Sequence, residues 1–169
     1  LIGRQEERII LGAARLSSRK MSEIMIPLED IVTLDLDHTM AESLLKQMFP
    51  HALYVKSAGV RTQELDPFAV AVMAELGQDI SGHRPMTFEE LEDWEGLNFD
   101  LIITLSPEAH HKALKLTHTI AADVEYWPTP DPTTTEGSRE QKLAAYREVC
   151  DGLSMRIRRR FAKAGAASG

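Results

Sequence analysis

Four short runs of apolar residues divide the chain, and each has the length and composition of a buried β-strand. They are rich in β-branched and aromatic residues and end in polar or turn-forming residues. The clearest is "FDLIITL", an almost unbroken apolar run that is typical of a central parallel strand covered on both faces. The four predicted strands are residues 31–36, 52–59, 99–105 and 122–127.

Helix-forming segments lie between these runs, and several begin with a capping residue. Thr39 and Glu42 have the spacing of a capping box, which predicts a helix over residues 40–48. Two further helices should start with a cap followed by proline, at Asp66-Pro67 and at Ser106-Pro107. Together with these, the predicted helices are residues 40–48, 66–77, 87–94, 106–116 and 139–161.

The regular alternation of strand and helix predicts an α/β fold. We expect three layers, with a four-stranded parallel sheet and helices on both of its faces. Ligands of such folds bind beyond the carboxyl ends of the strands. The segments expected at that edge are residues 35–39, 57–59, 104–107 and 128–137.

The composition is that of a globular protein with one sizeable core, since 43% of the residues are hydrophobic and 27% are charged. The formal charge of −7 argues against nucleic acid as a partner, because binding to phosphates needs a basic surface. The only cysteine, Cys150, excludes a disulfide framework and a zinc site built from several thiolates, and it fits a reducing cytoplasm. We expect no membrane segment and no signal peptide; the first residue, Leu1, suggests a piece of a longer protein.

Five motifs stand in the order in which a known family carries them: "MAESLLKQMF", "SAGV", "DPFAVAVMAELGQDISGHRP", "FDLIITLSPEAH" and "WPTPDPTTTEGS". Through them, residues 40–161 resemble the low-molecular-weight protein tyrosine phosphatases, a family that includes arsenate reductases. The resemblance implies hydrolysis of phosphate monoesters, on phosphorylated proteins or small esters, without a cofactor. It also implies that Asp131, followed by Pro132, is the general acid, and that Ser57 and His83 brace the phosphate loop.

The family's nucleophilic loop, a C-x5-R sequence between the first strand and the first helix, has no counterpart at the matching place. Counted back from "MAE", its cysteine would fall at Ile31 and its arginine at Asp37. Cys150 and Arg156 have the same spacing, but within a predicted helix, where no arc of free backbone amides can hold a phosphate. Without the thiolate nucleophile and the arginine, we expect a pseudoenzyme with negligible phosphatase activity.

Two carboxylates stand where that loop would be, in the sequence "VTLDLDHT". A carboxylate near a helix N-terminus stabilises the helix by about 0.3–1 kcal/mol, and Asp35 and Asp37 stand at such a place. They also repel a phosphate dianion. The same letters match the first motif of haloacid dehalogenase-type phosphotransferases, in which Asp35 would be the nucleophile and Asp37 the acid/base beside Mg²⁺. That alternative also needs a later acidic pair, and no convincing one follows the other strands. A non-catalytic binding protein is the third interpretation.

The other candidate residues also have structural interpretations. Asp131 suits the first position of an Asp-Pro turn, and His83 suits a structural histidine once the loop is missing. His110 and His111 are adjacent on a predicted helix, so they make a poor metal pair and are expected at the surface. No metal site follows from these residues.

Residues 1–30 do not share the phosphatase-like motifs of the rest of the chain. Apolar residues within residues 1–20 have helical spacing and predict a short amphipathic helix, at Ile9, Ile10, Ala13 and Leu16. The "IMIP" run before the first strand resembles the start of the paired cystathionine-β-synthase modules of some transporters. We therefore expect an N-terminal extension over residues 1–30, a phosphatase-like domain over 31–161 and a disordered tail over 162–169.

Overall fold

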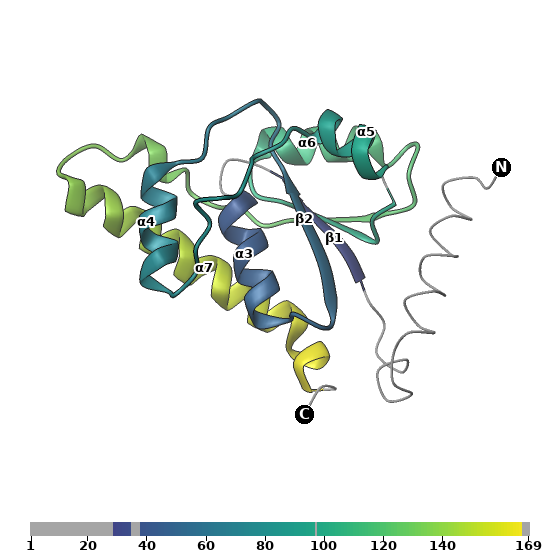
Figure 1. The fold of residues 1–169 in the computed structure, drawn as a ribbon. Coiled ribbons are helices and arrows are strands. Elements are labelled where there is room, and N and C mark those ends of the chain that lie inside the picture. Colours follow the sequence, from purple (N-terminus) through teal and green to yellow (C-terminus); the bar gives the residue numbers. More distant parts are fainter. Residues whose placement is uncertain (1–28, 35–37, 97, 167–169) are drawn as a thin grey trace.

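The computed structural model describes residues 29–34, 38–96 and 98–166, and for residues 29–34 it describes the backbone alone. Each strand is followed by one or two helical elements, as the sequence predicted (Figure 1). The elements are β1 (Glu29–Leu34), α3 (His38–Met48), β2 (Leu53–Ala58), α4 (Pro67–Glu75), α5 (Phe88–Glu95), β3 (Leu101–Thr104), α6 (Pro107–Leu116), β4 (Asp123–Tyr126), the 3₁₀ turn η1 (Pro132–Thr134) and α7 (Arg139–Ala166).

The four strands form one parallel sheet in the order β2-β1-β3-β4, which confirms the predicted α/β class. Ile31 of β1 pairs with Val55 of β2 and with Leu101 of β3. Because β1 is flanked on both sides, the strand order reverses direction between β1 and β3. The carboxyl edge beside this reversal is where an open parallel sheet offers space to a ligand.

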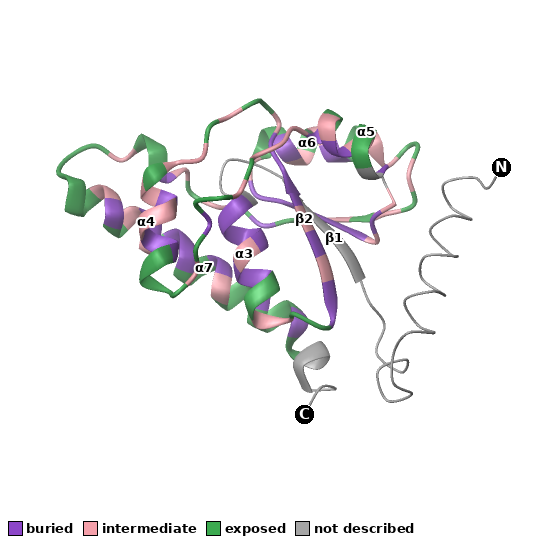
Figure 2. Ribbon diagram, viewed as in Figure 1, coloured by how far each residue is buried: buried purple, intermediate pink, exposed green. Residues whose placement is uncertain are grey.

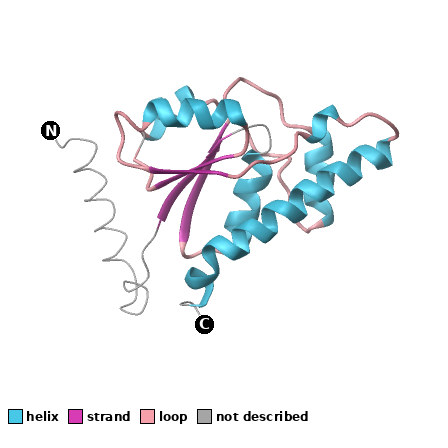
Figure 3. Ribbon diagram, turned by 180° about the vertical axis from the view of Figure 1, so that it is seen from behind, coloured by secondary structure: helices cyan, strands magenta, loops and turns pink. Residues whose placement is uncertain are grey.

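Helices cover both faces of the sheet (Figure 3). On one face α3, α4 and α7 enclose the larger apolar core, and on the other face α5 and α6 enclose the smaller one (Figure 2). The alternation of side chains along β3 explains the division, because Leu101 and Ile103 belong to the larger core and Ile102 to the smaller. All three are almost completely buried, as expected for a central parallel strand.

Local capping chemistry accounts for most helix starts. The Asp66 carboxylate accepts a hydrogen bond from the Phe68 amide, and the Ser106 hydroxyl accepts one from the Ala109 amide. Both helices then begin with proline, as predicted. At α5, Thr87 and Glu90 exchange the two hydrogen bonds of a capping box.

The capping box predicted for α3 is wrong. The helix begins at His38, so Thr39 lies inside the first turn and cannot act as its cap. The Glu42 side chain is instead buried against β2, where it accepts a hydrogen bond from Ser57. The Glu42 carboxylate is thus hydrogen-bonded to Ser57, which is distant in the sequence, and not to the backbone at the start of its own helix as the capping-box spacing predicted.

The predicted end of the last helix is also wrong. Helix α7 continues to Ala166, five residues beyond the expected end and into the segment predicted to be disordered. Phe161 marks an interruption there, with φ of −108° and ψ of 15°, but its ring is buried against Phe49 of the segment after α3. This packing holds the helix beyond the interruption, whereas the sequence shows only its small and basic residues.

Residues 1–28 lie outside the described part of the chain, and so do Asp35, Leu36 and Asp37. The predicted N-terminal helix and the module-like extension therefore remain predictions. Among the described residues, none of the helices combines the length and apolarity that a membrane crossing requires.

Candidate functional site

The carboxyl edge of the sheet brings together the ends of β1, β2 and β3 with the start of α3 (Figure 1). Strand β1 ends at Leu34, in register with Ala58 of β2 and Thr104 of β3. Helix α3 begins at His38, so three residues connect them. Two of the three are Asp35 and Asp37, which lie outside the described residues.

Helix α3 carries a buried carboxylate that faces β2. Glu42 is 4% exposed and accepts hydrogen bonds from the Ser57 hydroxyl and from the Lys46 ammonium one helical turn further along α3. Lys46 remains half in solvent while its ammonium pairs with the carboxylate. A buried charge needs such partners, because leaving it unpaired costs several kcal/mol, on the order of 3–5.

His83 approaches the same carboxylate from the loop after α4. Its Nε2 lies 3.9 Å from Glu42 Oε2 and has no hydrogen-bond partner among the described residues. Ser57 and His83, both expected to brace a phosphate loop, are thus brought together, with Glu42 between them. This role of Glu42 was not predicted from the sequence, where its only signal is an acidic residue on the inner face of an amphipathic helix.

Asp131 lies in the loop that follows β4. Its carboxylate Oδ1 accepts hydrogen bonds from the Thr133 amide at 2.9 Å and from the Thr133 hydroxyl at 2.5 Å. It therefore caps the short η1 turn that begins with Pro132. Within the described part of the chain, its recorded side-chain bonds stay inside this Asp-Pro turn, as the structural interpretation predicted.

A cavity of about 570 Å³ opens between the start of α3, the start of α4 and the Asp131 loop. Thr39 and Met40 line it on one side, and Pro132 and Thr133 on another. Lys142 of α7 supplies a cation to its wall. The hollow thus adjoins both the connection after β1 and the loop that carries the candidate acid.

Another part of the wall is a polar contact between two helices. Tyr146 of α7 donates its hydroxyl hydrogen bond to Asp66, the residue that caps α4. The Tyr146 ring also stacks on Phe68, with centroids 5.6 Å apart. These contacts hold α4 and α7 together at the rim of the cavity, so its shape is set by packed elements.

Cys150, the only cysteine in the sequence, lies in the larger core. It is 2% exposed, within the larger core, and its Sγ lies 3.7 Å from the Met73 sulfur. Arg156, six residues later, is exposed on the same helix α7. The C-x5-R spacing of these two residues does not form a phosphate loop.

The two adjacent histidines have different environments. His111 is exposed as predicted, but His110 is half-buried, and its predicted surface position is wrong. The Thr104 hydroxyl lies 3.2 Å from the Glu125 carbonyl oxygen and 3.1 Å from His110 Nδ1, and so links the His110 ring to β4. The His110 ring also stacks on Tyr126, with centroids 4.8 Å apart. No cluster of three or more metal-binding side chains occurs among the described residues.

Comparison with known proteins gives the family. The description "Low molecular weight phosphotyrosine protein phosphatase" matches residues 38–166. An arsenate reductase of Bacillus licheniformis is 35% identical over 126 residues, which cover 75% of this chain and 86% of that protein. The arsenate reductase of Bacillus subtilis is 33% identical over 127 residues, with the same two coverages.

Solved structures share the fold at lower identity. An arsenate reductase in its oxidized state aligns with a TM-score of 0.62 at 23% identity, covering 80% of this chain and 98% of that one. The tyrosine phosphatase Wzb from Escherichia coli K30, in complex with sulphate, aligns with a TM-score of 0.62 at 18% identity, covering 82% and 99%. The predicted resemblance is confirmed: this chain belongs to the low molecular weight phosphotyrosine protein phosphatase family.

Proposed function

We propose that this protein is a family member that does not hydrolyse phosphate monoesters by the family's thiol chemistry. The observation that carries the proposal is the position of its only cysteine. A thiolate nucleophile must reach the phosphorus atom and is activated near positive charge or a helix N-terminus. Cys150 is buried in the middle of α7 against Met73, so its thiol is closed off from a phosphate at the carboxyl edge of the sheet.

The backbone at the expected loop supports the same conclusion. Ile31, at the place of the family cysteine, lies within β1 and pairs with strands on both sides. The strand continues to Leu34, which leaves three residues before α3 begins. A phosphate cradle needs several consecutive amides that no strand partner has taken. Three residues between a paired strand and a helix offer little room for one.

Electrostatics at this connection oppose a phosphate ligand. In the sequence, Asp35 and Asp37 fall in this connection, and the helix α3 that follows it carries the buried Glu42 as a third carboxylate. Two like unit charges 4 Å apart repel by about 4 kcal/mol at an effective dielectric constant near 20. We infer that a phosphorylated protein or phosphate ester, the partner class of the family, binds this edge only weakly.

Arsenate reduction, the activity named for the relatives, is not proposed for this chain. Reduction of arsenate to arsenite consumes two electrons, which two thiols supply when they become a disulfide. This sequence has one cysteine, and its thiol is buried. A disulfide within one chain therefore cannot form.

The test is hydrolysis of p-nitrophenyl phosphate by the purified full chain, with and without added Mg²⁺. We expect no hydrolysis above the buffer rate in either condition. Metal-free hydrolysis that disappears in the Asp131→Ala variant would overturn the proposal, because it would reveal the family's general acid at work. Thermal melting of the variant alongside the parent shows that any loss of activity is not loss of fold.

The second candidate function has its own outcome in the same assay. The D-x-D-x-T sequence of residues 35–39 favours a metal-dependent phosphohydrolase, and its Thr39 lines the cavity. Hydrolysis that requires Mg²⁺ and is lost in Asp35→Asn would support that function and exclude the inactive one. The isosteric Asp→Asn change removes the nucleophilic charge with little change in side-chain volume.

A further inference from the structure

An unpartnered aromatic side chain stands on the helix that covers the smaller core. Trp94 of α5 is 81% exposed, the largest exposed fraction among the bulky apolar side chains of the described residues. Helix α5 itself is anchored by Phe88 and Leu91, which are fully buried, so Trp94 is not needed for packing. Exposed tryptophan is uncommon in domains without a partner and is enriched at binding surfaces.

The helix around Trp94 carries a strong negative charge. Helix α5 contains five acidic residues and no basic residue, a net charge of −5. Glu89 is neutralised by Lys112 of α6, and Glu90 is used in the capping box with Thr87. Asp93, next to Trp94, is exposed to solvent. A ligand for this surface needs an apolar patch flanked by cations.

The chain contains a segment with this chemistry. Residues 1–20 hold five basic and two acidic residues, a net charge of +3, and apolar residues at helical spacing. At the same spacing Arg8, Arg15 and Arg19 fall on one side, next to the side that carries Ile9 and Leu16. Apolar and cationic positions are therefore neighbours in this segment. On α5 the apolar Trp94 likewise has charged neighbours, but there the charges are negative.

The connection is long enough for the two to meet. Ile31 of β1 pairs with Leu101 of β3, and Trp94 precedes Leu101 by seven residues, so it lies within about 25 Å of that strand. The 28 residues before β1 span about 40 Å even if entirely helical. Residues 1–28 are covalently attached to the start of β1, and α5 is followed by the start of the neighbouring strand β3. The effective concentration of the segment at α5 is therefore high.

We propose that residues 1–20 of this chain dock on the outer face of α5, with their apolar side covering Trp94 and their arginines facing its carboxylates. The inference is independent of the proposed function, since it concerns neither the carboxyl edge of the sheet nor its chemistry. The interaction is intramolecular and partly electrostatic. It therefore weakens in high salt and does not depend on protein concentration.

The tryptophans provide a direct readout in the full chain. Trp127, the other tryptophan, is buried in the larger core, so acrylamide quenches mainly Trp94, and a Trp94→Phe variant supplies the Trp127 baseline. We expect the quenching constant of Trp94 in the parent to be about twofold lower than in the variant Arg8→Glu/Arg15→Glu/Arg19→Glu, because docking removes ring surface from solvent. In 1 M NaCl the two constants should become equal.

The matched control reverses three exposed arginines elsewhere, Arg156, Arg158 and Arg159 on α7, and should leave the parent's quenching constant unchanged. Adding Glu92→Lys/Asp93→Lys to the triple Arg→Glu variant should lower the quenching constant of Trp94 again, because opposite charges then face each other once more. Equal quenching in the parent and the segment variant at low salt would overturn the proposal. Protection that rises with protein concentration would also overturn it, because a second copy would then be the occupant.

Discussion

At the scale of single residues, we expect the buried carboxylate of Glu42 and its partners to contribute more to the free energy of unfolding than the exposed polar groups do. Glu42 is buried where an apolar side chain would normally pack, and the hydroxyl of Ser57, fifteen residues away, completes its hydrogen bonding. Lys46 balances its charge from the solvent side. Removing one of these partners leaves the other buried without its hydrogen bond or counter-charge, which lowers the free energy of unfolding.

The Glu42–Ser57 pair should therefore show strong coupling. In a double-mutant cycle with Glu42→Ala and Ser57→Ala, we expect a coupling energy of about 1.5–3 kcal/mol, since the hydrogen bond joins a buried charge. Urea unfolding of the four proteins measures it. The exposed pair Asp79 and Ser81, also hydrogen-bonded, is the control and should couple much less. Equal coupling in the two cycles would contradict the assignment.

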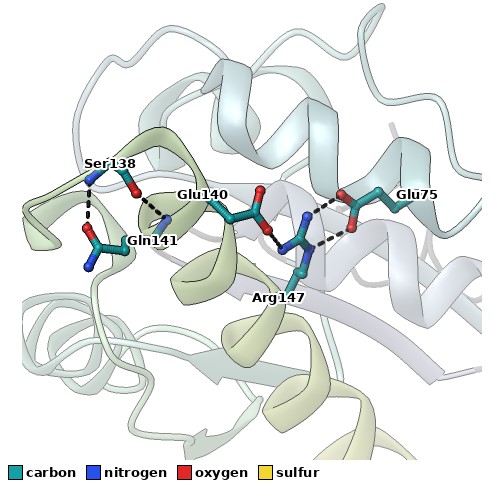
Figure 4. Close-up of polar contacts among 5 residues, drawn as sticks. All are labelled: Glu75, Ser138, Glu140, Gln141 and Arg147. Carbon is teal, nitrogen blue, oxygen red and sulfur yellow. Dashed lines mark hydrogen bonds and ion pairs between the residues drawn. The ribbon is translucent and has the colours of Figure 1, made fainter.

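At the scale of elements, helix α7 is fastened to the molecule at its first turns. Arg147 donates two hydrogen bonds to Glu75 of α4 and one to Glu140 of its own helix (Figure 4). At the N-terminus of α7, the Ser138 amide donates to the Gln141 side chain and the Ser138 hydroxyl accepts from the Gln141 amide. The start of α7 thus combines a local cap with a clamp between helices.

The clamp makes stability depend on pH in a defined window. The hydrogen bonds from Arg147 lower the pKa of Glu75 below its ordinary value of 4.5. A lowered pKa in the folded state stabilises the protein above the unfolded value and is lost as pH falls through the folded one. The parent should therefore melt higher than Glu75→Gln at pH 7, and the gap should close below about pH 4.5.

Thermal melting from pH 7 to pH 3 measures this gap. The control is Glu148→Gln, an exposed glutamate one residue after Arg147, whose small effect should not change in the same window. A gap for Glu75→Gln that stays constant down to pH 3 would show that Arg147 does not hold this carboxylate in its charged form.

Two glycines of the same region should respond in opposite directions to alanine. Gly137 has φ of +119°, and an added Cβ would meet Gln141 Oε1 at 2.1 Å, so Gly137→Ala should break the cap and cost about 1 kcal/mol or more. Gly152 lies inside α7 with nothing within 4 Å of an added Cβ. Gly152→Ala should stabilise by about 0.5–1 kcal/mol. Urea unfolding separates the two, and equal signs would contradict this account.

At the scale of the whole molecule, the two proposals concern different surfaces: the carboxyl edge of the sheet and the outer face of α5. The carboxyl edge carries the Glu42 cluster and a cavity between α3 and the Asp131 loop, whereas Cys150 lies in the larger core. Helix α5 begins beside Gly59 at that edge and leads toward the other, where β1 enters the sheet. The phosphatase assay and the Trp94 measurement can therefore fail separately.

The sequence predicted the elements well where the interaction that forms them is local. Asp66, Ser106 and Thr87 cap their helices with partners two or three residues away, so spacing alone revealed them. It misassigned Glu42, because Ser57 competes with the local backbone for that carboxylate. It also placed His110 at the surface, since nothing nearby in the sequence indicates Thr104 and Tyr126 as its neighbours.

By itself, the sequence determined the α/β class, the order of the elements and the presence of a single cysteine, Cys150. These follow from hydrophobic periodicity and residue identity, which need no coordinates. Only the tertiary structure decided that Cys150 is buried against Met73, that Ser57 and His83 meet at Glu42, and that α7 continues past Phe161. Each depends on contacts between residues far apart in the chain, and close packing selects those partners by shape and charge across the core.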